Sequence, residues 1–433
     1  MKRRQTLHDL QPFLTLWGSQ SVSSLGSAMT KYALIIWAYQ QLGTASSITM
    51  LSVCSFLPSI LFCFIAGALT DRWNKKKVML LSDTAAAMGT LSIFLLYGTE
   101  SLRIWHLYVM NFLLSFMDAF QRPAAYVAES LIIPKKYYAK ASGLQGFSNS
   151  LVMILSPALA TAILSFWGME AVFMIDLVSF AVAFFTLLLL INIPTVRVDH
   201  EKKKECILKS VIAGLNFLRE HATLFRIILF FSLINLLASL AGNAIMPAMI
   251  LARTGNDKVV LGMVSSAIGA GTLIGSILVT VAKPAKSRTK VIFGTCAASF
   301  LLCDFLWGLG RTPFLWVFAA FAGNLPLPFL TANMTTIMRT KVPIRMQGRV
   351  FSTRDTVQFI TIPVGFFLGG VLADHVFEPF MLTPSRLQQL LSHLVGTGRG
   401  SGMALIFLIT GTVGAAVSLI SLKDKHYREL DVQ

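Results

Sequence analysis

Charged side chains inside apolar stretches are the residues of this chain whose chemistry calls for an explanation. A charge at the centre of a bilayer costs at least about 2.5 to 3.5 kcal/mol even on permissive scales, so each such residue is a functional suspect. A carboxylate in a low-dielectric site can take up a proton near neutral pH, and an approaching cation reverses this. The chemistry these residues support is therefore the binding and release of protons. The candidates are Lys31, Asp83, Asp118, Asp176, Asp304 and the pair Arg354-Asp355.

Depth along the helices separates these candidates. Asp83 and the pair Arg354-Asp355 lie about one to two turns from the end of an apolar stretch, counted at roughly 1.5 Å per residue, where acids can meet cations. We expect structural or gating roles for them. Asp118 lies one turn before Arg122, so an intrahelical pair and a relay to cations of the preceding basic loop both stay open.

The remaining charges have fewer partners near them in the sequence. We hypothesise that Asp176 or Asp118 carries a coupling proton and that Lys31 is a cation whose partner changes during a functional cycle. A purely structural role for Asp176, bonding to helix backbones or hydroxyl groups, is the alternative. The predicted proton-coupling residues are Asp118, Asp176, Lys31 and Asp304.

Composition indicates that membrane-spanning helices position these residues. With 55% hydrophobic residues, a mean hydropathy of +0.68 and 13% charged residues, the chain has too little polar surface for a soluble protein of 433 residues. About 20 apolar helical residues cross a bilayer core of about 30 Å. We expect twelve spans, at Phe13–Tyr39, Ser46–Leu69, Val78–Tyr97, Trp105–Val127, Gly143–Trp167, Val172–Ile193, Leu224–Ile250, Val259–Val281, Val291–Leu309, Phe314–Ile337, Val350–Leu372 and Met403–Leu422.

The positions of the cations explain the net charge of +17. Of the 37 Lys and Arg residues, thirty fall on one side of the twelve spans, six on the other, and Lys31 inside the first span. The positive-inside rule predicts this asymmetry for a protein with both termini in the cytoplasm. The basic charge thus indicates topology and not a nucleic-acid partner. The five cysteines lack metal-binding spacing, and no metal or cofactor site is expected.

Two similar halves make up the predicted chain. The longest polar interruption separates six spans from six, so we predict bundles at residues 1–193 and 223–433, joined by a linker at 194–222 that contains an amphipathic helix. Ser24–Met29 in the first span is echoed by Ser239–Met246 in the seventh. A parallel repeat of this kind is one way in which membrane transporters are built.

The loop after the second span carries the most specific motif, Gly67–Lys77, with the sequence GALTDRWNKKK. An acid, Asp71, is followed by four cations. This pattern resembles the loop that characterises the major facilitator superfamily. With Gly18-Ser19-Gln20, Arg122-Pro123-Ala124 and Gly348–Ser352, the chain resembles an exporter of that superfamily, of the branch that includes macrolide-efflux and enterobactin-export proteins.

The resemblance implies an all-α polytopic fold of twelve helices in two six-helix bundles related by a parallel repeat. It also implies a gate in which Asp71 meets the start of the eleventh span and holds the bundles together on the cytoplasmic side. The corresponding loop of the second half, Lys283–Lys290, lacks an acid, so the gate is expected to be asymmetric. The predicted gating residues are Gly67, Asp71, Arg72, Lys75, Lys76, Arg122 and Arg349.

Two positions depart from the family pattern. Asn74 stands where the family usually has glycine, and Ser156–Thr161 replaces a Gly-Pro followed by paired glycines in the fifth span. The second departure reduces the support for a drug/proton antiporter. Small residues are kept there, so close helix packing is still expected.

Aromatic and amide side chains provide the clues to a substrate. Aromatic residues make up 11% of the chain, and several occupy spans that line the central cavity in this family. Such residues can form an adaptable apolar pocket with a few polar contacts. The predicted cavity residues are Gln20, Tyr32, Trp37, Asn111, Phe116, Asn235, Asn243 and Asn324.

The last external loop, about Val376–Ser401, is longer than its neighbours and is predicted to hold a short helix on the outer surface. Thr383 is expected to cap this helix, Pro384 to occupy its first turn and Gly396 to end it. A lid or packing role is favoured over ligand binding.

The sequence and the resemblance together predict a transporter and not an enzyme. We expect a monomeric protein of the bacterial inner membrane that exports a hydrophobic or amphiphilic molecule, such as a drug, a macrolide-like natural product, a peptide or a siderophore, by alternating access. Its partners are this substrate, protons and the lipid bilayer. An importer or facilitator of a small metabolite is the first alternative, and a non-transporting membrane sensor or enzyme the second.

Overall fold

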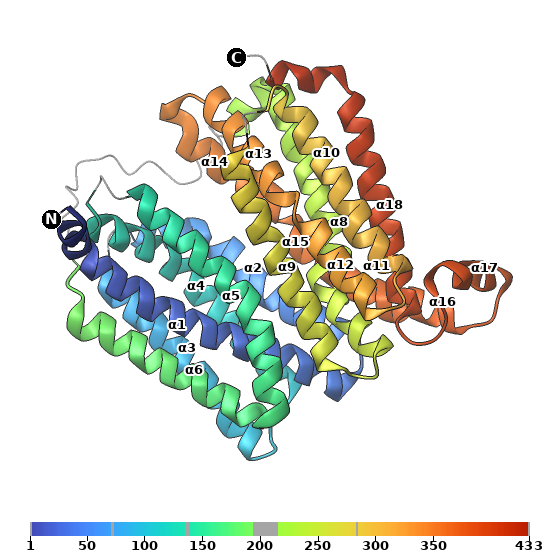
Figure 1. Cartoon of the computed structure of the whole chain (residues 1–433), viewed down its shortest axis with the longest axis horizontal. Helices are drawn as coiled ribbons and strands as arrows, with labels where there is room; N and C mark the ends of the chain where they lie inside the picture. The colour runs from blue at the N-terminus through green and yellow to red at the C-terminus, as the bar shows by residue number, and fades with distance from the viewer. Residues whose placement is uncertain (1, 71–72, 135–137, 194–214, 283–284, 432–433) are drawn as a thin grey trace. The chain divides into compact units, whose positions relative to one another are not determined.

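The computed structural model describes residues 2–70, 73–134, 138–193, 215–282 and 285–431 (Figure 1). Within these ranges every regular element is a helix. The chain forms two compact units: Met1–Trp37 with Cys54–Lys204, and Ala38–Val53 with Glu205–Gln433. The end of the first helix and the start of the second therefore pack with the later half of the chain.

Six helical stretches coincide with the first six predicted spans. They are α1 (Lys2–Leu42), α2 (Ala45–Thr70), α3 (Lys75–Gly98), α4 (Ile104–Ile132), α5 (Tyr138–Phe166) and α6 (Gly168–Phe185), which continues into the π-helical turn η2 (Thr186–Leu190). Asn74 caps α3, because its side-chain oxygen accepts a hydrogen bond from the Lys77 amide at 3.2 Å. The residue that departs from the family glycine thus has a structural role here.

The later half contains the other six spans, several of them interrupted. They are α8 (Ala222–Arg253), α9 (Lys258–Val281), α10 (Arg288–Phe300) continued by the π-helical turn η3 (Leu301–Phe305) and α11 (Leu306–Leu309), α12 (Pro313–Asn324) with α13 (Leu327–Lys341), α14 (Ile344–Phe359) with α15 (Thr361–Leu372), and α18 (Ser401–Lys423). The helix α8 kinks at Gly242, whose backbone angles are φ −56° and ψ −114°. The predicted linker helix lies largely outside the described residues.

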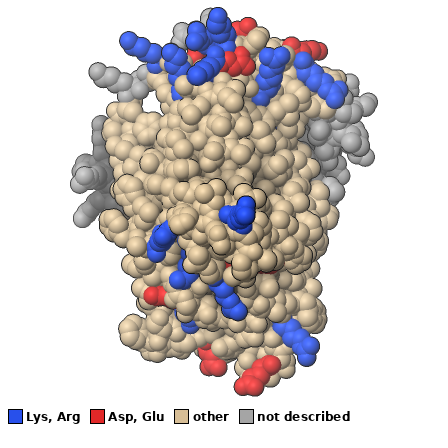
Figure 2. Space-filling view, turned by 90° about the vertical axis from the view of Figure 1, so that its right-hand side faces the viewer, with Lys and Arg blue, Asp and Glu red and all other residues tan. Residues whose placement is uncertain are grey.

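Ten helical stretches of the described ranges are long and apolar enough to cross a membrane. The remaining two predicted spans, α1 and α4, carry many of the polar residues that line the cavity described below. On the face of the molecule in Figure 2, Lys and Arg side chains crowd one end, and a broad band without charged side chains follows. Helices of this kind suit a hydrocarbon environment, in which backbone hydrogen bonds must be made within the chain.

Glycines let two helices of the later half approach closely. A Cβ atom on Gly365 would overlap the Ser239 side chain, and one on Gly369 would overlap the Leu240 carbonyl oxygen. The helices α8 and α15 therefore pack backbone to backbone. Small residues at such contacts are the usual basis of helix packing in membranes.

The short helix of the long loop is α17 (Arg386–Val395), and its predicted cap is wrong. Ser385 caps it, accepting a hydrogen bond from the Gln388 amide at 3.1 Å. The Thr383 hydroxyl donates instead to the Pro379 carbonyl oxygen at 2.8 Å, because Thr383 ends the preceding helix, α16 (Glu378–Leu382). Pro384 precedes the cap and does not enter the first turn. Gly396 ends α17 with φ +84°, as predicted.

The C-terminal tail supplies the acid that the loop before α10 lacks. The tail forms a 3₁₀ helix, η5 (Lys425–Leu430), with Tyr427 packed against Phe293 at 4.8 Å between ring centroids. Asp431 accepts hydrogen bonds from the Ser287 and Thr289 hydroxyls, both at 2.6 Å, and from the Thr289 amide at 3.0 Å. A carboxylate at the N-terminus of α10 is also favoured by the helix dipole.

Replacing Asp431 by asparagine should loosen this tail. Partial burial opposes ionisation, but the hydrogen bonds from Ser287 and Thr289 lower the pKa of Asp431. A lowered pKa contributes stability that is present above the unfolded-state value of about 3.9 and is lost as the pH falls through the folded-state value. Since hydrogen bonds to charged groups contribute about 1.5–3 kcal/mol, D431N should speed tryptic cleavage at Lys425 and Arg428 by about tenfold or more.

The matched control for this prediction is Glu429→Gln. Glu429 also belongs to the tail, but glutamine keeps an oxygen that can accept the Thr223 hydroxyl. E429Q should be cleaved at the wild-type rate. The wild-type tail should become sensitive to pepsin only in acid below about pH 4. Equal cleavage of D431N and the wild-type protein would contradict the assigned anchor.

Candidate functional site

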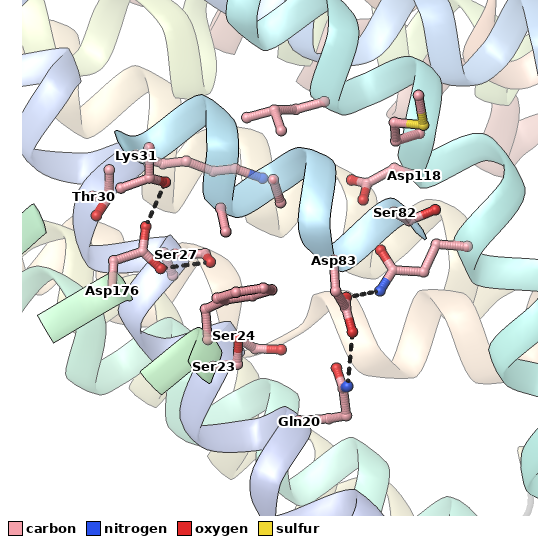
Figure 3. A pocket seen from close by; sticks show the side chains of 18 of the residues that line it. Gln20, Ser23, Ser24, Ser27, Thr30, Lys31, Ser82, Asp83, Asp118 and Asp176 are labelled. Carbon is pink, nitrogen blue, oxygen red and sulfur yellow. Dashed lines mark hydrogen bonds between the residues drawn. The ribbon is translucent and has the colours of Figure 1, made fainter. Parts of the chain in front are cut away.

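A polar cavity of about 660 Å³ lies within the first unit, lined by side chains from α1, α3, α4, α5 and α6 (Figure 3). Its wall on α1 is a stripe of Gln20, Ser24, Ser27 and Lys31. The spacings of four, three and four residues put these side chains on one face of the helix. A polar stripe on an apolar helix is thus explained by the cavity it faces.

The helices α3 and α4 contribute similar stripes. Asp83 and Thr90 are two turns apart on α3, and Asn111 and Asp118 are two turns apart on α4. Residues seven apart share a helix face. Other positions of these helices carry exposed apolar side chains, such as Leu95. Each helix therefore directs some of its polar side chains at the cavity.

Asp176 forms the first acid centre of the cavity. This residue of α6 is buried, with 3% of its surface exposed. Its Oδ1 accepts a hydrogen bond from the Ser27 hydroxyl at 2.9 Å, and its Oδ2 accepts one from the Thr90 hydroxyl at 3.0 Å. The carboxylate therefore joins α1, α3 and α6. These two hydroxyl contacts agree with a purely structural role for Asp176. Proton binding by Asp176 stays a prediction.

Lys31 is the cation beside this acid. It lies one turn beyond Ser27 on α1 and is exposed within the cavity. Figure 3 shows its side chain extending away from Asp176, toward the part of the cavity that Asp118 lines. Its positive charge acts on the Asp176 carboxylate. Movement of this flexible side chain can therefore change the charge balance at Asp176.

A glycine positions α1 against Asp176. A Cβ atom on Gly26 would overlap the Ser179 hydroxyl and lie 3.0 Å from the Asp176 Cα atom. Gly26→Ala should therefore displace α6 from α1, with a loss of stability of about 1–3 kcal/mol, as is usual for overpacking. A thermal unfolding scan of the purified protein would measure this loss.

The same helix offers a matched control. A Cβ atom on Gly18 would have nothing within 4 Å, so Gly18→Ala should leave the unfolding temperature unchanged or slightly raised. If both alanine variants unfold at the wild-type temperature, the close approach of α1 and α6 is not as tight as described.

Asp83 forms the second acid centre. Its Oδ2 accepts a hydrogen bond from the Gln20 amide at 3.2 Å, and its Oδ1 accepts one from the Gln121 amide at 2.5 Å. The carboxylate thus joins α1, α3 and α4, and the charge of Asp118 acts on it. Counting turns from the end of the span suggested a structural or gating residue. The structure places Asp83 in the cavity wall.

The cavity can bind both protons and a polar or charged group of a ligand. It combines three carboxyl groups with one lysine, so negative charge is in excess when all are ionised. Gln145, Ser148 and Asn149 of α5 add further hydrogen-bonding groups. Across the described residues, no group of three or more His, Cys, Asp or Glu side chains is placed to hold a metal ion.

Three of the four predicted proton-coupling residues lie in this cavity: Lys31, Asp118 and Asp176. Asp304 lies elsewhere, buried in the π-helical turn η3 of the later half. For a single acid in an apolar span, the sequence does not show whether its side chain faces a cavity or packs between helices. Only the packing of neighbouring helices distinguishes Asp304 from Asp176.

The predicted substrate residues of the first unit divide in a similar way. Gln20 and Asn111 line the cavity, whereas Tyr32, Trp37 and Phe116 are not among its lining residues. Phe116 packs against the aromatic rings of Phe62 and Phe120, at 4.8 and 5.1 Å between centroids. Phe116 therefore has a packing role in this structure, and Asn111 accepts a hydrogen bond from the Ser55 hydroxyl at 2.9 Å.

The predicted asparagines of the later half bond to helix carbonyl groups. Asn235 donates to the Gln358 carbonyl oxygen at 3.0 Å, and Asn324 to the Ala320 carbonyl oxygen at 2.8 Å. The side chain of Asn243 lies outside the described part of the chain. Substrate contacts by these residues stay predictions.

Much of the predicted gate lies outside the described residues, namely Asp71, Arg72 and the side chains of Arg122 and Arg349, whereas Gly67 belongs to α2. Lys76 is described, and its ammonium group donates to the carbonyl oxygens of Leu188 at 3.0 Å and Ile191 at 2.7 Å. It therefore caps the C-terminal end of the sixth span, where a cation is favoured. Lys75 donates to the Trp73 carbonyl oxygen at 3.1 Å. Gating by either lysine stays a prediction.

A further carboxylate, which sequence analysis missed, holds the start of α2. Asp374 lies in the π-helical turn η4 (Ala373–Phe377) and accepts hydrogen bonds from the amides of Ala45 at 3.0 Å and Ser46 at 2.7 Å. A Cβ atom on Gly370 would overlap the Thr49 hydroxyl, so the two helices approach closely. We call this contact the Asp374 clasp. A carboxylate at a helix N-terminus is stabilised by the free amides and by the helix dipole.

The sequence profile of the Major Facilitator Superfamily matches residues 16–366. The chain therefore belongs to this superfamily, and the protein is a multi-pass membrane transporter. Over 427 residues it is 25% identical to macrolide efflux protein A of Streptococcus pyogenes, covering 97% of this chain and 98% of that protein. The family predicted from the loop Gly67–Lys77 is confirmed.

Solved structures agree on the fold. A mutant form of the nucleoside transporter NupG matches with a TM-score of 0.70 at 13% identity, covering 95% of this chain and 99% of NupG. A bacterial homologue of the iron transporter ferroportin in an inward-facing state matches with a TM-score of 0.69 at 11% identity, covering 96% and 99%. The predicted all-α major facilitator fold is confirmed, and identities this low speak for the fold alone.

Proposed function

We propose that this transporter exports hydrophobic or amphiphilic small molecules across the bacterial inner membrane, driven by protons. The observation that carries the proposal is the cavity with two acid centres and one lysine inside a bundle of apolar helices. Charged side chains inside membrane spans are energetically costly, and they commonly mark pathways for protons or substrates. Similarity to macrolide efflux protein A supports the outward direction and an amphiphilic cargo.

Proton coupling is assigned to Asp176 and its neighbour Lys31. When Asp176 is ionised, its charge compensates that of Lys31, whose charge acts on it. A proton on Asp176 removes this compensation and makes the cavity more positive. The affinity for a ligand that carries charge changes accordingly, which is how two binding events are coupled thermodynamically. Asp118 remains the alternative proton carrier.

Substrate contact is assigned to the other end of the cavity. Gln20 and Gln121 orient the Asp83 carboxylate, and the charge of Asp118 acts on Asp83. Two neighbouring carboxyl groups suit a ligand that brings a positive charge or several hydrogen-bond donors. The apolar part of the cargo is expected to rest on the apolar residues of the wall, such as Trp17, Met110 and Phe180.

Alternating access provides the movement, and the protein is expected to act as a monomer. With both termini in the cytoplasm, the Asp374 clasp lies at the external ends of the helices. It holds the first turn of α2 to the end of the eleventh span, and it has to open before substrate can leave. Asp71 is expected to make the opposite contact, at the cytoplasmic start of the same span.

Transport in inverted membrane vesicles tests this function. Vesicles that contain the protein should accumulate a radiolabelled macrolide or an amphiphilic dye when their interior is acidic, and a protonophore should abolish the accumulation. Failure of a broad panel to move under any pH gradient would overturn proton-driven export. Accumulation in energised whole cells, in place of exclusion, would favour the importer or facilitator.

A further inference from the structure

The helix α17 exposes its apolar face. Leu387, Leu390 and Leu394 have 64%, 65% and 48% of their surfaces exposed. Their spacings of three and four residues put them on one side of the helix. The other side carries polar residues, namely Arg386, Gln389, Ser392 and His393. In an aqueous setting, an amphipathic helix would turn its leucines inward, so this helix is oriented for an apolar surrounding.

Two arginines fix the last turn of α17. The Arg253 guanidinium donates to the Val395 carbonyl oxygen, and Arg311 donates to the His393 carbonyl oxygen at 2.6 Å. Carbonyl groups at the end of a helix lack partners within the helix, and cations there are stabilising. These contacts hold the C-terminal end of α17 to the rest of the later half, where Val395 is buried and the three leucines are exposed.

The same contacts set the depth of α17 relative to the membrane spans. Arg253 is the last residue of the span formed by α8, and it also donates to the Gly400 carbonyl oxygen at 3.3 Å. Gly400 directly precedes the span formed by α18, and Glu378 accepts hydrogen bonds from the amides of Gly400 and Gly402. The last turn of α17 thus lies at the level at which two spans end.

The direction of the helix agrees with this depth. In Figure 1, α16 and α17 extend sideways from the end of α18. The helix α17 therefore lies to the side of the end of α18. Helices that lie in a membrane interface bury their apolar face about 5–10 Å deep, at the boundary between headgroups and acyl chains.

The charge of this segment completes the pattern. Residues 379–401 contain Arg386, His393 and Arg399 but neither Asp nor Glu. Basic residues at a membrane surface are attracted to anionic phosphate groups by about 1 kcal/mol each. The segment thus combines the apolar face of α17 with basic residues close to it.

We propose that α17 is an interfacial anchor, with Leu387, Leu390 and Leu394 inserted among the acyl chains of the adjacent leaflet and Arg386 beside lipid phosphate groups. The leaflet is the outer one if both termini are cytoplasmic. The proposal does not depend on the transported substrate. It replaces the expectation of a lid or packing element with a lipid contact.

Site-directed quenching tests the insertion. In a variant whose native cysteines are replaced, Leu390→Cys and Gln389→Cys are each labelled with an environment-sensitive fluorophore, and the full protein is placed in nanodiscs of phosphatidylglycerol and phosphatidylethanolamine. The two positions are neighbours in sequence, but Leu390 lies on the apolar face of α17 and Gln389 on its polar face. Brominated acyl chains should quench the label at residue 390 about twofold or more strongly than that at residue 389. Aqueous iodide should show the reverse order.

Several outcomes would overturn the anchor. Equal iodide quenching at both positions would place the leucines in water. Protection of residue 390 that rises with protein concentration, without quenching by brominated lipid, would assign the face to a second copy of the chain. Both labelled positions are exposed, so neither change should disturb folding, and a size-exclusion profile matching the wild-type profile verifies this.

The lipid charge is tested separately through Arg386. Raising the phosphatidylglycerol content should increase the bromolipid quenching at residue 390, and Arg386→Gln should remove this dependence. Replacement of Lys258, the first residue of α9, serves as the control for a general loss of positive charge. If R386Q keeps the full dependence on phosphatidylglycerol, the phosphate contact is wrong.

Discussion

Asp176→Asn should reduce proton-driven accumulation to the level of vesicles without a pH gradient. Asparagine has nearly the size of aspartate, and its oxygen can still accept one of the two hydroxyl hydrogen bonds from Ser27 and Thr90. It cannot take up a proton, and it cannot compensate the charge of Lys31. Exchange of labelled for unlabelled substrate needs no net proton movement, so exchange should continue. Gradient-driven uptake and exchange, measured in the same vesicles, separate lost coupling from lost folding.

Asp83→Asn is the matched comparison within the same cavity. Asp83 is also a carboxyl group that joins three helices, but its donors are the amides of Gln20 and Gln121. If it contacts substrate, D83N should change the substrate affinity and keep the dependence on the pH gradient. Asp118→Asn tests the other candidate for the proton. Undiminished coupling in both D176N and D118N would sink the proposed mechanism.

The helices and the family could be predicted because both are local properties of the sequence. Apolar runs of sufficient length mark the spans, and the loop Gly67–Lys77 carries a specific order of acid and cations. The sequence also predicts in part which side of each helix carries polar residues. Asp83 with Thr90 and Asn111 with Asp118 share the seven-residue spacing that puts them on common faces. That signal could have placed Asp83 in the cavity, whereas counting turns from the end of the span did not.

Contacts between distant segments could not be predicted, because no local pattern announces them. Asp431 reaches Ser287 and Thr289 across more than 140 residues, and Asp374 reaches Ala45 and Ser46 across more than 320. In the sequence both acids look like ordinary charges near helix ends. The loop before α10 has no acid of its own, and folding brings Asp431 there from the tail. Which helix N-terminus a carboxylate caps is decided by the tertiary fold.

Asp374→Asn should shift the protein toward the state that is open at the clasp. The substitution removes the charge that faces the amides of Ala45 and Ser46 at 3.0 and 2.7 Å. Asparagine keeps one acceptor oxygen, so the loss is that of a charge at a helix N-terminus, about 0.3–2 kcal/mol, which corresponds to a change of about two- to thirtyfold in a two-state equilibrium. Ser47 is buried beside the clasp, so labelling of Ser47→Cys by a membrane-impermeant maleimide should speed up by the same factor.

His375→Ala is the control for this measurement. His375 is exposed and occupies the same π-helical turn, so its loss should leave the labelling rate unchanged. Gly370→Ala should act like D374N, because the added methyl group would overlap the Thr49 hydroxyl and prevent the close approach. Unchanged labelling in both D374N and G370A would show that the clasp does not control access.

Combining the clasp variant with Asp71→Asn decides whether one equilibrium joins the two ends of the eleventh span. Asp71 is expected to stabilise the state that is closed on the cytoplasmic side, so D71N alone should cripple transport and slow the labelling of Ser47→Cys. The two substitutions then shift one two-state equilibrium in opposite directions. Their free energies should add, because distant and independent sites are additive to within about 0.5 kcal/mol. Labelling of the double variant should therefore return toward the wild-type rate. A double variant labelled as fast as D374N would mean that the two carboxylates act on separate movements.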